Sequence, residues 1–563
     1  MTTAQNWAAI LAAQGIAEAE IDAARNSADA IAQKIHDLPS DPTRSIDPVS
    51  HQAVLQSLTE QAPAEGAGTG AGTGAGPGSA TGSASATPVP QDHGLPETIE
   101  DMARSLQAGE ITAVELAERA AARLEACHTA LNAVARLEME RALTQAKAAD
   151  AQFAALRRSG ETPSPLLGIP VAHKDLYARA ECLMEAGGTI LKGHIASQTA
   201  ASIQALDRAG AVDMGRVNTV EFALGPDGRN IHTGAIRNPW QPAHVTGGSS
   251  SGSGAAVGFG AVPAALGSDT GGSVRLPAAA CGVVGVKPTA GLIGRSGIFP
   301  LSGSLDTAGP LTGCVRDAAV MIQAMTGPDP LDPQSVARPA TDLLAMLEDG
   351  LGTLRIGLAE TPFFDPVTDE IAQAVEAAAG LAAAEGAALS RIEMPGIADA
   401  NIRTIAITNT EGAAQHRTWM ARRAQEYGRE TLGRLMSGLF IPGITYATAS
   451  AGRALLLRHL LDTVFRDVDL VMTPVWPCDP PRIEGDDAGS YHQRVQLLGH
   501  CTRPVNYLGL PAVVLPCAVS AAGLPIAVQF IGRPFEEALL LRAARGYERA
   551  RAFRAEHSPV SRA

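Results

Sequence analysis

A glycine- and serine-rich stretch at residues 247–288 holds two serines that could act as nucleophiles. Ser249 lies in the run Gly-Gly-Ser-Ser-Ser-Gly and Ser273 in the run Ser-Asp-Thr-Gly-Gly-Ser-Val-Arg, and the stretch contains eleven glycines. Glycine lets a backbone turn sharply and approach a ligand closely. A serine hydroxyl is a weak nucleophile until a base removes its proton. The stretch therefore predicts a catalytic loop that needs a base from elsewhere in the chain.

Lys174 is the candidate for that base. It ends a short apolar segment at residues 167–174, and the chain has only five lysines against thirty-nine arginines. Of these two side chains, only an amine can lose its proton near neutral pH. Burial at the end of an apolar strand would lower the pKa of the ammonium. A Ser-His-Asp arrangement stays open as an alternative, because it is defined by geometry.

The same stretch allows simpler interpretations. Residues 248–252 fit Gly-x-Ser-x-Gly, the nucleophile elbow of α/β-hydrolases, for which His492 or His500 could supply the histidine, but three serines among glycines meet this pattern easily. Residues 252–258 approximate a dinucleotide-binding fingerprint with the wrong final spacing. Taken singly, serines in such segments more often cap turns. The joint occurrence of the two serines and the lysine favours catalysis.

Other polar residues of the stretch are expected to support the loop. Asp269 and Arg275 are predicted to pair and hold the turn together, and Lys287 is predicted to make a structural hydrogen bond. Cys281 is expected to pack in the core. These assignments leave Lys174 as the base.

Three motifs in this order resemble those of the amidase signature family. They stand at residues 247–252, 267–277 and 281–289, and the resemblance runs from about residue 95 to about residue 553. Ser251 occupies a position where many members have glycine, although serine also occurs there. The resemblance implies that Ser273 is the nucleophile, that Ser249 is a bridging serine after a cis peptide bond at Gly248, and that Lys174 is the base.

The resemblance also implies a mechanism. Neutral Lys174 takes a proton from Ser249, which takes one from Ser273, whose hydroxyl then attacks an amide carbonyl carbon. Backbone N–H groups at residues 270–273 are the predicted oxyanion donors, because glycines let the chain curl around one point; they belong to Thr270, Gly271, Gly272 and Ser273. No metal ion or organic cofactor enters this scheme.

The composition of the whole chain limits the classes of partner. The chain has 563 residues, of which 45% are hydrophobic and 18% charged, and a net charge of −14. The negative charge argues against nucleic-acid binding. Neither a membrane span nor a signal peptide is expected. Seven scattered cysteines without a C-x-x-C pair predict reduced thiols and a cytoplasmic location.

The first 91 residues differ from the rest in composition. Apolar residues at helical spacing predict a small helical module at residues 1–61, with a first short helix, a second helix that buries every third or fourth residue, and a third helix from about residue 48. Residues 62–91 are nearly all Gly, Ala, Ser, Thr and Pro, which predicts a flexible tether. The module weakly resembles the small separate subunit that some amidase signature enzymes bind. A non-catalytic extension is the simpler interpretation.

Residues 92–563 are predicted to form the catalytic domain. Two long amphipathic helices end near Arg157, and alternating strand and helix patterns follow, which predicts an α/β fold with a central mixed sheet covered by helices on both faces. Beyond residue 327 helices are expected until strands return at 468–474, 512–516 and 526–531. A helix at residues 536–550 closes the predicted fold.

Three hypotheses of function follow. The first is an amidohydrolase that cleaves a small carboxamide, or a carbamate or urea-like bond, and works as a homo-oligomer. The second is the glutamine-hydrolysing component of a tRNA-dependent amidotransferase. The third is a catalytically silent scaffold, against which the presence of all three catalytic residues argues. Candidates for lining the substrate pocket are Tyr177, Ser250, Trp419 and Tyr446.

Overall fold

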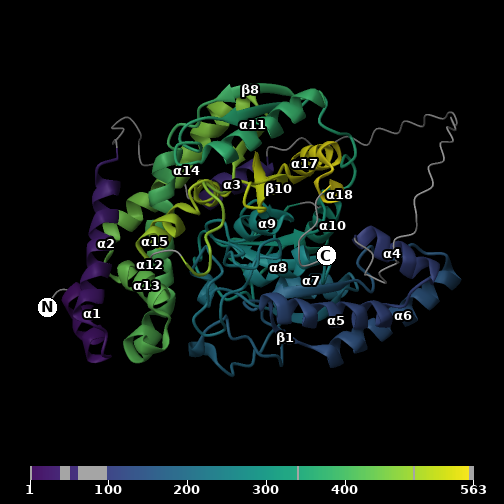
Figure 1. Cartoon of the computed structure of the whole chain (residues 1–563), viewed down its shortest axis with the longest axis horizontal. Coiled ribbons are helices and arrows are strands. Elements are labelled where there is room, and N and C mark those ends of the chain that lie inside the picture. The colour runs from purple at the N-terminus through teal and green to yellow at the C-terminus, as the bar shows by residue number, and fades with distance from the viewer. Residues whose placement is uncertain (1–2, 39–50, 61–97, 339–340, 486–487, 557–563) are drawn as a thin grey trace.

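The computed structural model describes residues 3–38, 51–60, 98–338, 341–485 and 488–556 (Figure 1). The α-helices are α1 (Thr3–Ala13), α2 (Glu18–His36), α3 (His51–Glu60), α4 (Ile99–Ala108), α5 (Ala113–Leu131), α6 (Met139–Ser159), α7 (Ala201–Arg208), α8 (Ser251–Phe259), α9 (Arg275–Cys281), α10 (Val315–Met325), α11 (Asp369–Ala384), α12 (Ile397–Arg423), α13 (Arg429–Phe440), α14 (Gly443–Asp467), α15 (Ala488–Leu497), α16 (Arg503–Leu508), α17 (Glu537–Arg551) and α18 (Phe553–Glu556).

One mixed sheet contains the eleven strands of the described residues, in the order β1-β3-β2-β4-β6-β5-β10-β11-β9-β7-β8. Strand β2 runs parallel to both β3 and β4, and β7 runs parallel to both β8 and β9, whereas the other neighbours are antiparallel. The strands are β1 (Val134–Leu137), β2 (Pro170–Lys174), β3 (Val212–Val217), β4 (Ala264–Asp269), β5 (Val284–Lys287), β6 (Thr307–Thr312), β7 (Arg355–Ala359), β8 (Ala388–Ile392), β9 (Leu470–Pro474), β10 (Ala512–Val519) and β11 (Pro525–Gly532).

Two groups of helices contact the central strands. Helices α8 and α9 pack on each other and on strands that include β4 and β5, whereas α10 and α17 pack on each other and contact β5, β6, β10 and β11. The glycines of α8 permit its close packing, since a Cβ atom on Gly254 would lie 3.0 Å from Pro277 of α9. The predicted α/β fold with a central mixed sheet is confirmed.

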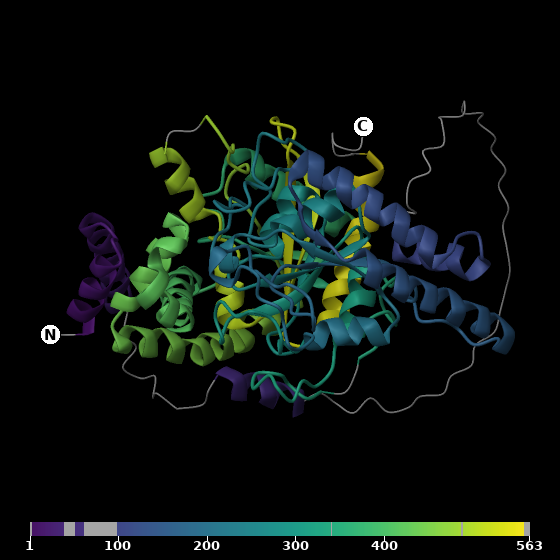
Figure 2. The ribbon, with the colours of Figure 1, turned by 90° about the horizontal axis from the view of Figure 1, so that it is seen from below.

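The predicted helices before residue 61 are present. Helix α2 buries the apolar positions expected from its spacing, which are Ile21, Ala24, Ala28, Ile31 and Ile35. Helices α1 and α2 lie against the green helices on one side of the molecule, opposite α4 to α6, whereas α3 lies apart from α1 and α2 (Figure 2). The predicted tether at residues 62–91 lies outside the described residues.

Two different parts of the catalytic region receive the N-terminal helices. Glu20 of α2 forms an ion pair of 2.7 Å with Arg429 of α13, and the guanidinium of Arg25 lies 5.4 Å from the ring centre of Phe440. Helix α3 contacts α14 instead, and the Gln52 side chain nearby donates a hydrogen bond of 2.8 Å to the carbonyl of residue 334. The module therefore docks on the catalytic region rather than forming a core alone.

Strands β7 and β8 occupy a region for which the sequence predicted helices. They run parallel and are joined by α11, which packs against β8. Strand β8 is an edge strand whose residues 388–391 are exposed, so it lacks the apolar alternation that marks a half-buried strand. The alanine-rich helix α11 between the two strands gave this part of the sequence a helical pattern of residues. The prediction that helices dominate from residue 327 until strands return at residue 468 therefore missed these two strands.

The docking of α2 can be tested at Ala28, whose side chain is 0% exposed. Ala28→Arg should separate α2 from its neighbours, because a bulky charged side chain fits no close-packed apolar contact; we expect a cost of at least about 2 kcal/mol in docking free energy. Hydrogen exchange of the α2 amides measures the change. Ala30→Arg, at an exposed position of the same helix, is the control, and equal protection of α2 in both variants would contradict the docking.

Candidate active site

Lys174 lies at the centre of the candidate site. Strand β2 carries it between β3 and β4, and its side chain is 0% exposed. Its Nζ donates a hydrogen bond of 2.8 Å to Oγ of Ser249 and one of 2.9 Å to Oγ of Ser268. The predicted base and the predicted bridging serine are therefore in direct contact. Ser268 is a partner that the sequence motifs did not single out, although it begins the run that ends at Ser273.

The electrostatics of Lys174 suit a base. Burial lowers the pKa of its ammonium to about 7, and the negative charges of Asp306 and Asp269 oppose this effect. Asp306 is partly buried close to the site, and its carboxylate accepts a hydrogen bond of 2.5 Å from Oγ1 of Thr270. Near neutral pH a substantial fraction of the amine is uncharged and can accept a proton.

The turn before α8 holds Ser249 in place. The peptide bond between Gly248 and Ser249 is cis, as the resemblance implied. The Ser249 carbonyl accepts hydrogen bonds from the amide of Val220 (3.2 Å) and from Oγ1 of Thr219 (2.9 Å). Oγ of Ser251 donates to the Gly247 carbonyl at 2.7 Å, so the serine at this variable position closes the turn.

Ser273 stands in the loop between β4 and α9. Its carbonyl accepts a hydrogen bond of 3.2 Å from the amide of Ser250, which joins the loop to the turn that carries Ser249. Ser273 is 9% exposed, whereas Lys174 and Ser249 are both 0% exposed. Among the three predicted catalytic residues, Ser273 is thus the one open to a substrate.

A buried ion pair fixes the loop around Ser273. The Arg275 guanidinium donates to both carboxylate oxygens of Asp269 at 3.0 Å, and both side chains are 0% exposed. The predicted pair is confirmed. Asp269 also accepts the amides of Gly272 (2.8 Å) and Val274 (3.1 Å). The charge of Arg275 holds the pKa of Asp269 well below its usual value despite burial.

The predicted oxyanion donors divide into two groups. The Gly272 amide donates to Oδ1 of Asp269 and so holds the turn instead of pointing at a substrate. The amides of Thr270, Gly271 and Ser273 have no hydrogen-bond acceptor among the described residues. Gly272 has φ +132°, and a Cβ atom there would lie 2.3 Å from Oγ1 of Thr502, so this turn requires glycine. We retain the other three amides as candidate donors.

The four candidates for the substrate pocket have different environments. Tyr177 and Ser250 are 0% exposed and donate to the backbone carbonyls of Gly267 (2.6 Å) and Ser268 (3.3 Å), so they support the site from within rather than line a cavity. Trp419 is partly buried and stacks on another aromatic ring at 6.2 Å between centres. Tyr446 is partly buried and donates a hydrogen bond of 2.8 Å to a glutamate.

The α/β-hydrolase interpretation is wrong. The central serine of that pattern, Ser250, is the buried residue that bonds to Ser268. The ring nitrogens of His500 contact Asn401 (3.2 Å) and the carbonyl of Pro362 (2.7 Å). The side chain of His492 lies outside the described residues. No histidine of the described part of the chain hydrogen-bonds to a serine hydroxyl.

Lys287 is the other buried lysine whose pKa is lowered to about 7. Its Nζ donates to the carbonyl of Pro288 at 3.0 Å, as expected of a structural residue. Within the described residues it makes no hydrogen bond to a serine, so Lys174 remains the candidate for the base. The seven cysteines, Cys281 among them as a buried residue, are free thiols.

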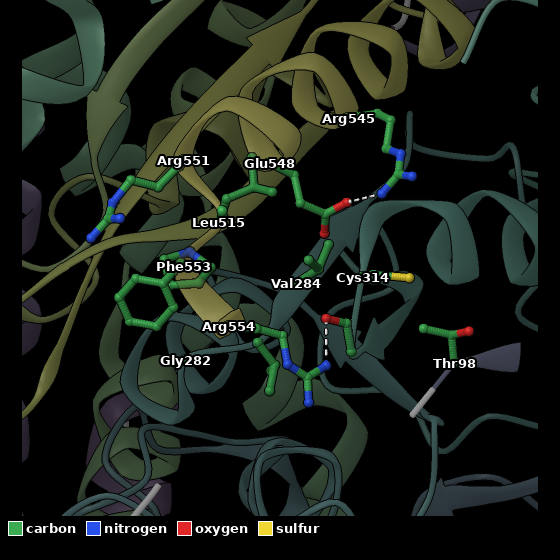
Figure 3. A pocket seen from close by; sticks show the side chains of 14 residues that line it. Thr98, Gly282, Val284, Cys314, Leu515, Arg545, Glu548, Arg551, Phe553 and Arg554 are labelled. Atoms are coloured by element: carbon green, nitrogen blue, oxygen red, sulfur yellow. Dashed lines mark hydrogen bonds and ion pairs between the residues drawn. The ribbon is translucent and has the colours of Figure 1, made fainter. Parts of the chain in front are cut away.

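Two cavities of the described residues lie apart from the Ser273 hydroxyl. One of about 210 Å³ is lined by residues of α17, α18 and β10, by residues at the start of β5 and by residues that follow β6. Two of its cations already have acceptors: Arg545 pairs with Glu548, and Arg554 donates to a carbonyl (Figure 3). The other, of about 190 Å³, reaches Ser268 and Asp306. It approaches the Lys174 amine from the side of Ser268.

The described residues contain neither a metal-binding cluster nor a membrane-spanning helix. No cluster of three or more His, Cys, Asp or Glu side chains there could hold a metal ion. None of the helices in the described ranges has the length and apolarity needed to cross a membrane.

The geometry places the buried amine of Lys174 against the hydroxyl of Ser249, and a backbone hydrogen bond joins the turn of Ser249 to the loop of Ser273. The chain belongs to the amidase family, whose model matches residues 115–541. This match confirms the resemblance drawn from the three motifs.

The chain is similar to one curated component of a multi-subunit enzyme. It is 36% identical over 491 residues to the A subunit of glutamyl-tRNA(Gln) amidotransferase from Chloroflexus aggregans, with 83% of this chain and 99% of the relative covered. It is also 36% identical to the corresponding protein of Neisseria meningitidis serogroup C, with 79% and 96% covered.

Solved structures extend the likeness to other reactions. One is the structure of a vestigial protein complex that reveals the evolutionary origins of an s-triazine catabolic enzyme. It has a TM-score of 0.76 and 34% identity, with 80% of this chain and 98% of that chain covered. A 6-aminohexanoate cyclic dimer hydrolase with bound substrate has a TM-score of 0.72 and 26% identity, with 83% and 99% covered. The glutamyl-tRNA(Gln) amidotransferase protein from Thermotoga maritima has a TM-score of 0.65 and 30% identity, with 80% and 94% covered.

The charge of Asp306 should set the acidic limb of the pH–rate profile. Activity requires the neutral Lys174 amine, so kcat/KM should fall as the pH drops below about 7. Asp306→Asn removes the negative charge that raises the pKa of Lys174 most. The pKa should fall, and the acidic limb should move to lower pH.

The control for this experiment is Asp462→Asn, which removes an exposed carboxylate on α14. Its profile should match that of the unaltered protein. A limb that stays in place in Asp306→Asn, or moves to higher pH, would count against Lys174 as the base.

Proposed function

We propose that this protein hydrolyses a carboxamide through an acyl-enzyme on Ser273. The observation that carries the proposal is the contact of 2.8 Å between the buried Lys174 amine and Oγ of Ser249. A lysine with a pKa of about 7 in that position can relay a proton that an ammonium with an ordinary pKa could not. The family, and relatives that include hydrolases of C–N bonds, support the same reaction class.

The proposed cycle has two halves. Lys174 accepts the Ser249 proton while Ser249 accepts that of Ser273, and the Ser273 oxygen forms a bond to the amide carbon. The candidate donor amides of Thr270, Gly271 and Ser273 then stabilise the oxyanion. The proton returns through Ser249 to the departing nitrogen, the C–N bond breaks, and ammonia or an amine leaves. Water hydrolyses the ester by the same relay, giving the carboxylic acid and free Ser273.

A second candidate is glutamine hydrolysis as the glutamine-hydrolysing component of an amidotransferase. The names of the curated relatives favour this candidate over a free-standing amidase, and these relatives are covered almost completely. In that case the ammonia would be used by a partner protein that holds the tRNA, since the acidic chain itself has a net charge of −14. Both candidates share the acyl-enzyme on Ser273.

Ser273→Ala tests the chemistry common to both. We expect amide turnover to fall at least about 1,000-fold, because the variant lacks the atom that forms the acyl bond. Ammonia release measures turnover for a panel of amides, carbamates and glutamine, and mass spectrometry of quenched enzyme detects the acyl group.

Ser159→Ala, at an exposed position on α6, is the matched serine control and should keep full activity. The melting temperature of both variants should equal that of the unaltered protein. Normal turnover in Ser273→Ala, or an acyl group found on another residue, would refute the proposed mechanism.

A further inference from the structure

Two arginines without an acidic partner among the described residues lie beside the two catalytic turns. Arg503 begins α16, and its Cγ would be 3.4 Å from a Cβ atom on Gly271, which precedes Ser273 by two residues. Arg434 of α13 lies on the other turn: its Nη1 donates to the carbonyl of Leu224 at 2.5 Å, and the next carbonyl, of Gly225, packs against Gly248. The Arg503 side chain therefore passes the loop of Ser273, and the Arg434 guanidinium contacts the segment that packs on the turn of Ser249, so the two arginines come from two different helices.

Each guanidinium group donates hydrogen bonds only to neutral acceptors among the described residues, and these acceptors use only part of its N–H donors. Arg503 donates to the Asn401 side chain and to the carbonyl of Gln496, each at 3.2 Å. Neither Arg503 nor Arg434 forms an ion pair with a carboxylate in the described part of the chain, where many other arginines do so. Burying part of a cation without a counter-ion costs free energy. Two such arginines beside the same site therefore indicate that their charge has a function.

The two charges also act on each other. Burial and the positive charge of Arg434 lower the pKa of Arg503 to about 10. With this pKa Arg503 remains cationic near neutral pH, and an anion that lies between or beside the two guanidinium groups relieves their repulsion. A guanidinium matches a carboxylate with two parallel N–H donors, whereas a neutral amide group gains much less.

Resting on the proposed hydrolysis of an amide, we propose that the substrate is a net negatively charged amide, such as the monoamide of a dicarboxylic acid, whose carboxylate binds Arg503 with Arg434 contributing to the attraction. The amide carbon then faces Ser273 while the carboxylate is held beside Gly271. A substrate that also carries an ammonium group, as glutamine does, brings a positive charge toward two guanidinium groups and is disfavoured.

The test compares amides that differ only in charge. Malonamate, succinamate and glutaramate are each paired with the neutral amide in which a methyl group replaces the carboxylate, namely propanamide, butanamide and pentanamide, and glutamine is added. We expect at least one of the three anionic amides to exceed its neutral partner by about 10–100-fold in kcat/KM. Glutaramate should exceed glutamine.

Variants locate the effect. Arg503→Gln should lower kcat/KM for the preferred anionic amide about 10-fold or more, chiefly by raising KM, and change the neutral amide less than about 2-fold. Arg503→Lys should restore part of the preference, because it keeps the charge but not the two-pronged donor. Arg429→Gln is the control, since it removes an arginine charge from α13 that is paired with Glu20. Thermal unfolding shows whether each variant is folded.

A binding measurement separates this inference from the proposed reaction. Glutarate and malonate need no turnover, and calorimetry should show one of them binding to the unaltered protein and binding at least about 10-fold more weakly to Arg503→Gln. Equal use of charged and neutral amides, glutamine as the better substrate, or dicarboxylate binding that ignores Arg503 would overturn the inference while leaving Ser273 catalysis intact. Loss of the Ser273 dependence would instead remove the proposed function.

Discussion

The buried amine of Lys174 is the constraint on which the rest of the site depends. An ammonium group loses its hydration when it is taken into the interior, so burial favours the neutral amine. The two serine hydroxyls at 2.8 and 2.9 Å give that amine hydrogen-bond partners without giving it a counter-charge in direct contact. Strand β2 lies between the two parallel strands β3 and β4, and the Lys174 side chain at its end is 0% exposed.

The ion pair of Asp269 and Arg275 positions the loop of Ser273, just as strand β2 positions Lys174. The guanidinium also donates to Asn506 (2.6 Å) and Gln529 (2.7 Å), so the loop that carries Ser273 is tied to α16 and to β11. Both oxygens of the buried carboxylate accept hydrogen bonds, which is the condition under which such a pair is tolerated. Loss of either partner would leave an uncompensated charge in the core beneath the loop.

The helices of the first 60 residues bear on the site indirectly. The family match begins at residue 115, so they belong to a part of the chain outside it. They cover α12 to α14, and α13 carries Arg434, so their packing stabilises the helices from which one of the two unpaired guanidinium groups reaches the site. The architecture thus places an additional layer of helices behind a candidate specificity element, whereas the candidate base Lys174 is carried by strand β2 of the sheet.

The sequence by itself identified the candidate catalytic residues and the mixed α/β fold. Lys174, Ser249 and Ser273 stand in motifs whose glycines and serines have local causes, and Asp269 and Arg275 are only six residues apart, so neighbouring sequence was enough to identify them. The tertiary structure decided which groups surround them: Ser268 and Asp306 at the amine, the use of the Gly272 amide by Asp269, and the approach of Arg434 and Arg503. Some of these contacts join distant segments, such as Leu224 and Arg434, which are 210 residues apart. Other contacts depend on the direction in which a loop amide points. A local sequence pattern specifies neither the contacts between distant segments nor the direction of an amide.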